Sequence, residues 1–239
     1  MDLLQDSHSS LSLQEIASQA GINKSTACRL LAHLEAEKYL GRDDKGGYCL
    51  GQKLLRLGNN YHVQAPLRER ARESLWELWR VTQETVNLAV LDGLEVVYID
   101  CLESPHDFRL VSNAGMRAIL YRTALGKAIV AFLPPEQREL IVKSLHFQAF
   151  TPHTHTTAEQ LNRDLNSVRK NGYAVDCEES VLGLRCIAAP ILDRKGIAVA
   201  GISISGPASR ITPQKTPAMG TTVKTAAHEI SQRLLASPG

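Results

Sequence analysis

A capping motif, a glycine and a leucine-rich stripe follow one another near the N-terminus and strongly restrict what this part of the chain can form. Ser12 with Glu15 three residues later is a capping box, which starts a helix. Gly21 ends that helix, because glycine adopts backbone angles that other residues resist. Asn23 is a suitable cap for a second helix. That helix carries an inward-facing apolar stripe formed by Ala27, Leu30, Leu31 and Leu34. Two short helices joined by a glycine turn predict a helix-turn-helix.

A glycine-rich hairpin is predicted directly after the second helix. Residues 39–42 and 48–50 are strand-like, and the segment between them contains the Asp and Gly residues that tight hairpins favour. A hairpin in this place is the wing of a winged helix-turn-helix. A short helix over 51–58 is expected to follow it.

The polar face of the second helix is the candidate DNA-binding surface, because in a helix-turn-helix this helix enters the major groove. Arg29 can donate two hydrogen bonds to a guanine, and the helix N-terminus favours phosphate. Residues 1–60 hold seven basic and seven acidic side chains, so the position of the charges must carry the argument. The alternative is an ordinary solvated face. The candidate DNA-binding residues are Lys24, Ser25, Thr26, Arg29, Arg42 and Lys45.

The chain changes character near the polar stretch 59–66, beyond which predicted strands and longer helices alternate. The strands are expected at 86–91, 94–100, 108–112, 118–121, 173–177, 184–192 and 197–205. The helices are expected at 67–85, 123–132, 136–145, 158–170 and 217–235. Strands joined by hairpins, with helices packed beside them, predict an α+β fold with an antiparallel sheet. We expect a DNA-binding domain over 1–58, a linker helix over 59–72 and a sensor domain over 73–239.

Cysteine usage and hydropathy exclude several classes of protein. The chain has five cysteines, an odd number, which are widely spaced and form no CxxC motif. This argues against a disulfide framework or a structural zinc site. No apolar run reaches the roughly 18 residues of a membrane span, and the first ten residues lack the pattern of a secretion signal. The expected location is therefore the cytoplasm.

Three segments carry a resemblance to a known family. These are SLQEIASQAGINKSTACRLLAHLEAEKYLGRDDKGGYCLGQKLLRLG, RTALGKAIVAFL and NGYAVDCEESVLGLRCIAAPILDRKGIAVAGISISGPASRI. In this order they resemble the IclR-type (isocitrate lyase regulator) transcription factors. The resemblance implies a winged helix-turn-helix, a linker helix and a GAF-like antiparallel-sheet effector-binding domain. It also implies a homodimer or homotetramer on palindromic operator DNA, a small organic or aromatic acid as effector, no cofactor and no enzyme activity.

The same resemblance implies an effector pocket. Its residues would be Thr123, Ala124, Leu125, Asp176, Leu184, Cys186, Ser203 and Ser205. The set is chemically reasonable, because Ser203 and Ser205 face the same side of a strand and a helix N-terminus at Thr123 offers N–H groups to a carboxylate. Without the resemblance, Cys186 and Ser203 are better explained as buried structural residues than as effector ligands. The segment ESPHDFRLVSNAGMRAILYRTALGKA is most similar to the sugar-acid-responsive branch.

Two features leave other functions open, and a third departs from the family pattern. Cys177 and Cys186 on neighbouring strands are compatible with a thiol-based sensor or a GAF-like redox enzyme. The histidines His146, His153 and His155, or Asp176 with the two cysteines, are compatible with a metal sensor. The family usually has a full helix ahead of the capping box, whereas only residues 1–6 stand there in this sequence.

Overall fold

The computed structural model describes residues 10–44 and 46–236. The chain divides into two compact units, one up to Pro66 and one from Leu67 onward. This boundary falls within the predicted linker helix. Within the described ranges, no helix combines the length and the apolar character that crossing a membrane requires.

The N-terminal unit contains the predicted helix-turn-helix and wing. Its helices are α2 (Leu13–Gln19) and α3 (Lys24–Ala36), and its strands are β1 (Leu40–Arg42) and β2 (Tyr48–Leu50). The Ser12 hydroxyl accepts the Glu15 N–H, and the Glu15 carboxylate accepts the Ser12 N–H, so the capping box is confirmed. Gly21 has a φ of +64°, which is the left-handed conformation that ends α2.

A small apolar core holds this unit together. It consists of Leu11, Ile16, Ala17, Ala27, Leu31, Leu40 and Tyr48. The prediction that Leu30 faces inward is wrong, because its side chain is 51% exposed. Helix α2 is short and covers only part of α3. The buried stripe of α3 is therefore narrower than the predicted one.

A single helix, α4 (Gln52–Thr82), replaces the two helices that were predicted on either side of the polar stretch. Pro66 lies inside it, although proline lacks a backbone N–H and normally interrupts a helix. Leu67, Ala71, Leu75 and Leu78 are buried against the sheet of the second unit. Tertiary packing therefore accounts for the part of α4 that follows Pro66.

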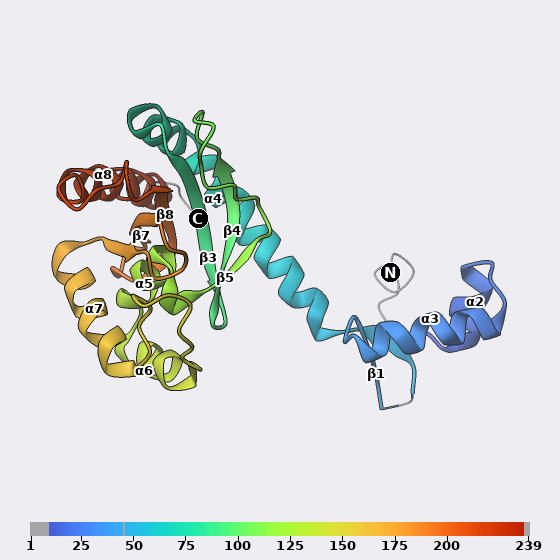
Figure 1. Ribbon diagram of the computed structural model, residues 1–239. Helices are drawn as coiled ribbons and strands as arrows, with labels where there is room; N and C mark the ends of the chain where they lie inside the picture. The colour runs from blue at the N-terminus through green and yellow to red at the C-terminus, as the bar shows by residue number, and fades with distance from the viewer. Residues whose placement is uncertain (1–9, 45, 237–239) are drawn as a thin grey trace. The chain divides into compact units, whose positions relative to one another are not determined.

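The C-terminal unit is built on one antiparallel sheet with the strand order β5-β4-β3-β8-β7-β6 (Figure 1). The strands are β3 (Thr85–Asp92), β4 (Glu95–Leu102), β5 (Arg117–Ile119), β6 (Ala174–Cys177), β7 (Leu184–Leu192) and β8 (Ala198–Pro207). A 3-10 turn, η1 (Leu120–Arg122), follows β5. The helices are α5 (Ala124–Ala131), α6 (Pro135–Ser144), α7 (Ala158–Asn171) and α8 (Thr216–Leu235). The predicted α+β class with an antiparallel sheet is confirmed.

Two cores lie on opposite faces of this sheet. Alternate strand residues such as Leu88, Ile187 and Ile202 join the core that α4 and α8 cover. Ala188 and Cys186, which point the other way, join the core that contains α5 and α7. Figure 1 shows α8 and the group of α5, α6 and α7 on different sides of the strands.

The strand predicted over 108–112 is absent, because β5 takes the sheet edge beside β4 instead. The segment runs as irregular chain and is attached by its carbonyl groups. Thr85 Oγ1 donates to the Leu110 carbonyl at 2.7 Å, and Arg210 Nη1 donates to the Phe108 carbonyl at 3.0 Å. The segment is therefore held to β3 and to the turn after β8 without belonging to the sheet.

Candidate functional site

The first two turns of α3 expose the predicted polar face. Lys24, Ser25 and Arg29 are exposed, and Thr26 is half-buried. The Asn23 side chain accepts hydrogen bonds from the Thr26 N–H and the Ser25 hydroxyl, both at 2.9 Å. The cap thus fixes the start of α3 while leaving the Lys24 and Arg29 side chains on the surface.

The wing residue Arg42 is bound to its own unit. Its guanidinium donates to Glu35 at 2.9 Å and to the Tyr48 hydroxyl at 2.7 Å, and it lies 4.4 Å from the centre of the Tyr48 ring. The hydrogen bond to Glu35 raises the pKa of Arg42. Arg42 therefore ties the wing to α3, which is a role that sequence reasoning missed. Lys45 lies outside the described residues.

Most of the predicted effector residues come together on the face of the sheet that α5 covers. Asp176 pairs with Cys186 across β6 and β7, and Cys186 pairs with Ser205 across β7 and β8. Ser203 lies two residues along β8, on the same face. All four are at least nine-tenths buried.

The start of α5 borders this face. Thr123 is the N-cap of α5, and its hydroxyl accepts the Gly126 N–H at 3.1 Å. Ala124 and Leu125 are buried in the adjoining core, while Leu184, at the first position of β7, is only half-buried. The structure therefore groups the predicted residues in space but leaves Leu184 at the margin.

Asn87 is a central member of this face that the sequence analysis missed. Its amide donates to Ser205 Oγ at 3.3 Å and to Ser203 Oγ at 3.5 Å, and its Oδ1 accepts from the Ser112 hydroxyl. Ser112 Oγ in turn lies 3.0 Å from Cys101 Sγ. An asparagine in the middle of the apolar run TVNLAV was the available signal, because a buried amide needs polar partners.

Arg122 adds positive charge close to the same face. Its guanidinium lies 3.9 Å from the centre of the Phe150 ring, and its buried Nε has no hydrogen-bond partner among the described residues. Burial raises the pKa of Tyr98, and the positive charge of Arg122 acts against that rise. Arg122 is therefore a cationic group with a spare donor.

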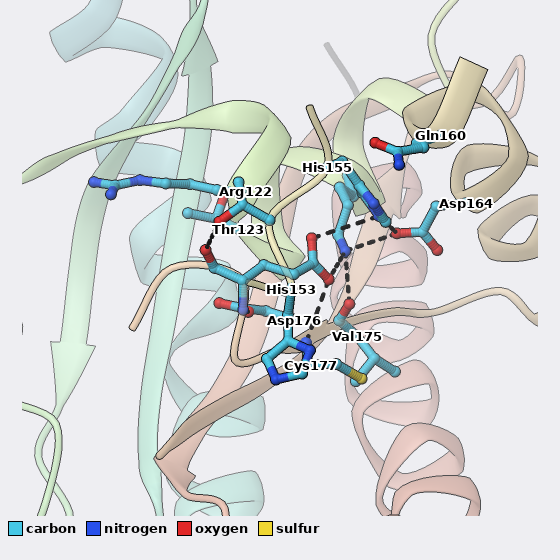
Figure 2. A network of polar contacts seen from close by, with 12 residues as sticks. Arg122, Thr123, His153, His155, Gln160, Asp164, Val175, Asp176 and Cys177 are labelled. Carbon is cyan, nitrogen blue, oxygen red and sulfur yellow. Dashed lines mark hydrogen bonds and ion pairs between the residues drawn. The ribbon is translucent and has the colours of Figure 1, made fainter. Parts of the chain in front are cut away.

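A buried lysine holds together the elements beside this face. Lys127 on α5 is fully buried, and its Nζ donates to Asp164 at 2.7 Å, to the Val175 carbonyl at 2.7 Å and to Glu179 at 2.5 Å. His155 Nε2 lies 3.0 Å from the same Asp164 oxygen (Figure 2). Burial alone would lower the pKa of Lys127, but the Glu179 and Asp164 carboxylates outweigh burial and raise it.

The lysine network reaches Asp176 through the backbone. The N–H groups of Glu179 and Ser180 donate to Asp176 Oδ1 at 2.7 and 3.4 Å, and Ser180 Oγ donates to the Arg122 carbonyl at 2.7 Å. Burial, and next the Glu179 charge, raise the pKa of Asp176 to about 6. The position and the protonation of Asp176 both depend on this loop.

Potential metal ligands gather in a hollow of about 560 Å³ on the outer side of the lysine network. Ligand atoms of His155, Asp164 and Glu179 lie within 4.8 Å of one another, and His153 and Cys177 line the same hollow. This differs from the sets that the sequence suggested, since Asp176 and Cys186 do not belong to the group found among the described residues. Lys127 already compensates the two carboxylates, which disfavours a divalent cation.

Comparison with known proteins gives consistent results over both units. A family model described as "Bacterial transcriptional regulator IclR C-terminal" matches residues 59–232, and one described as "IclR helix-turn-helix domain" matches residues 1–44. The HTH-type transcriptional regulator BhcR of Paracoccus denitrificans is 37% identical over 93% of this chain and 80% of its own. The transcriptional repressor IclR of Escherichia coli is 34% identical over 97% of this chain and 85% of its own. The crystal structure of Thermotoga maritima IclR matches with a TM-score of 0.69 and 36% identity, over 98% of this chain and 94% of that one.

Replacing Lys127 by methionine removes the cation between two buried carboxylates. We expect Lys127→Met to lower the free energy of unfolding by about 3–5 kcal/mol, because breaking a buried ion pair leaves uncompensated charge. The measurement is urea unfolding followed by circular dichroism. Lys143→Met is the matched control: Lys143 forms an exposed pair with Glu139, worth under about 1 kcal/mol. Equal losses for the two variants would contradict the role given to Lys127.

The raised pKa of Asp176 predicts a pH dependence of stability. An acid whose folded pKa lies above its unfolded value binds more protons when folded, so stability falls as pH rises through the interval between them. For Asp176 that interval runs from 3.8 to about 6. Its contribution should decline by up to about 3 kcal/mol across this interval.

The check is the difference between the wild type and Asp176→Asn in unfolding free energy at several pH values between 4 and 7. The variant should lose less stability than the wild type as pH rises. Parallel pH profiles for the two proteins would show that Asp176 titrates normally.

Proposed function

Because this chain belongs to the IclR family of bacterial transcriptional regulators, with a helix-turn-helix domain and an effector-binding domain, we propose that it binds a palindromic operator through α3 and the wing. We propose further that a small organic acid on the polar face of the sheet changes its affinity for that operator. The observation that best supports the proposal is the group of buried polar side chains Asn87, Ser203, Ser205 and Asp176 on one face of the sheet. Its place of action would be the cytoplasm, where the chromosome lies.

The DNA-binding half of the proposal rests on exposed donors at the start of α3. Arg29 has the bidentate geometry that reads guanine, and Lys24 with the N-terminal N–H groups suits phosphate. Ser25 and Thr26 are short donors beside them. A palindromic operator requires two copies whose recognition helices reach half-sites about 34 Å apart, so the working form is a homodimer or a homotetramer.

The effector half of the proposal rests on the chemistry of the buried face. The Arg122 guanidinium and the N-terminus of α5 after Thr123 favour a carboxylate. Asn87, Ser203 and Ser205 can exchange their mutual hydrogen bonds for bonds to ligand oxygens, and the Asp176 carboxylate can accept from a hydroxyl. This many polar groups favour a hydroxylated acid of the sugar-acid type over a purely aromatic one.

The thiol-based alternatives, a redox sensor or a redox enzyme, are disfavoured by the setting of Cys186. Burial, and next the Asp176 charge, raise the pKa of its thiol, whereas a reactive cysteine needs a lowered pKa. The metal-sensing alternative is disfavoured because the Lys127 ammonium already compensates the Asp164 and Glu179 carboxylates. A small-molecule mechanism needs neither: the ligand has only to bind one arrangement of the protein more tightly than the other.

Arg29→Ala tests the DNA-binding half. We expect it to weaken binding to the chain's own promoter by about 10- to 100-fold, equivalent to about 1–3 kcal/mol, while binding to random duplex changes little. The measurement is fluorescence anisotropy at fixed salt with both duplexes. Arg163→Ala, which removes an exposed arginine from α7, is the matched control and should leave both affinities unchanged.

Ser205→Ala and Asn87→Ala test the effector half. A panel of sugar acids and aromatic acids should raise the thermal midpoint of the wild type for at least one member, because a ligand that binds only the folded state stabilises it. The shift with that ligand should shrink in both variants, while promoter affinity without ligand stays intact. An unchanged ligand shift in both variants would place the effector site elsewhere.

A further inference from the structure

The wing is a small hairpin whose position beside α3 depends on few contacts. Its strands β1 and β2 have three residues each, and a hairpin of this size is at most marginally stable by itself. Along the β2 edge it is attached by backbone, since Tyr48 and Leu11 exchange N–H···O hydrogen bonds of 2.8 and 3.0 Å. On the β1 side, the side chain of Arg42, the last residue of β1, reaches the last turn of α3. The angle between the wing and α3 therefore depends on Arg42.

The Arg42 guanidinium uses most of its donors inside its own unit. Nε donates to Glu35 Oε1 at 2.9 Å and Nη2 donates to Glu35 Oε2 at 3.2 Å, which makes a two-pronged ion pair. Nη2 also donates to the Tyr48 hydroxyl at 2.7 Å, and Nη1 donates to the Gly46 carbonyl at 3.5 Å. Four of the five N–H donors of an arginine are thus engaged. A phosphate contact by Arg42 would have to compete with this set.

Glu35 lies on the side of α3 that is proposed to read DNA. Ser25, Cys28, Ala32 and Glu35 follow one another at intervals of three, four and three residues, so they share one face of the helix. A lone carboxylate at the end of this face would repel the phosphates of a bound duplex. Arg42 compensates that charge, and the pair as a whole is neutral. Arg42 therefore adds no net charge to this face, and its contribution to DNA binding has to be geometric.

We propose that Arg42, Glu35 and Tyr48 form a clamp, here called the wing clamp, that sets the angle between the wing and α3 for operator binding. Arg42 and Glu35 are positioning residues in this arrangement. Two elements that are already held at the right angle lose less freedom when they bind one duplex, and this raises affinity. The inference rests on the proposed function, in which α3 and the wing contact the same DNA. It has an unusual consequence, since the acidic residue Glu35 increases affinity for a polyanion.

Arg42→Lys separates the geometry of the clamp from its charge. Lysine keeps the positive charge but lacks the planar fork that binds both Glu35 oxygens. We expect Arg42→Lys and Arg42→Gln to weaken binding to the chain's own promoter equally, by about fivefold. The measurement is fluorescence anisotropy of the full-length protein at fixed salt without effector. If Arg42 instead contacts a phosphate directly, Arg42→Lys binds like the wild type, and this result overturns the proposal.

Glu35→Ala gives the second and sharper result. It removes a negative charge and frees Arg42, so electrostatics alone predicts tighter binding to DNA. The clamp predicts the opposite, a loss of about three- to fivefold. The double variant Glu35→Ala/Arg42→Lys should bind no more weakly than either single variant, because both changes break the same contact. Tighter binding by Glu35→Ala, or losses that add up in the double variant, contradict the clamp.

Asp44→Asn is the matched control. Asp44 is an exposed acid in the wing loop, and its replacement makes the same charge change as Glu35→Ala without touching the clamp. This variant should bind the promoter at least as tightly as the wild type. Thermal melting followed by circular dichroism checks that every variant is folded.

A measurement without DNA separates failure of the clamp from failure of the proposed function. Hydrogen–deuterium exchange of the full-length protein should be faster over β1 and β2 in Arg42→Lys and Glu35→Ala than in the wild type or Asp44→Asn, because the loosened hairpin opens more often. Unchanged exchange overturns the clamp, whatever the protein does with DNA. A wild type without preference for its own promoter overturns the proposed function instead. A wild type with that preference, and clamp variants that share its full affinity, overturns the present proposal alone.

Discussion

The buried ammonium of Lys127 is the interaction on which the effector-binding unit depends. A lysine removed from water is tolerated only when its charge is fully compensated and its donors are used. Here Asp164 of α7, Glu179 of the loop after β6 and the Val175 carbonyl of β6 supply all three acceptors. One side chain thereby joins α5, α7 and the sheet. Other positions of these elements cost free energy, because each would leave a buried charge without a partner.

The lysine network also sets the geometry of the proposed effector site. Glu179, which holds Lys127 with its side chain, holds Asp176 with its backbone N–H. Lys127 is four residues along α5 from Thr123, whose hydroxyl caps that helix. The two ends of the site, the α5 N-terminus and the Asp176 carboxylate, are therefore fixed by one network. A ligand that changes the charge on Asp176 acts on the same loop that compensates the lysine.

Local chemistry in the sequence was sufficient to predict the elements that depend on it. The capping box at Ser12, the turn at Gly21 and the hairpin strands of the sheet follow from residues close together in the chain, and the structure has them. The failures have a common cause in tertiary packing. The position of the part of α4 after Pro66 depends on burial of Leu67 and Leu75 against the sheet, and the loss of the strand over 108–112 depends on which segment takes the sheet edge.

The candidate site shows the same division. The predicted residues on β6, β7 and β8 lie side by side in the sheet. They could be predicted because the resemblance supplied positions that spacing alone does not give. Asn87 was missed because its role depends on the register between β3 and β8, which places it opposite Ser203.

The register between β3 and β8 has a further consequence. Asn87 points to the proposed effector face while its neighbours Val86 and Leu88 point to the core under α4, so we propose β3 as the strand through which a ligand would alter the packing of α4. Since α4 begins in one unit and ends in the other, a ligand that favours one packing of its C-terminal half over another has a covalent connection to the DNA-binding unit. Its effect on operator affinity is then limited only by how differently it binds the two packings.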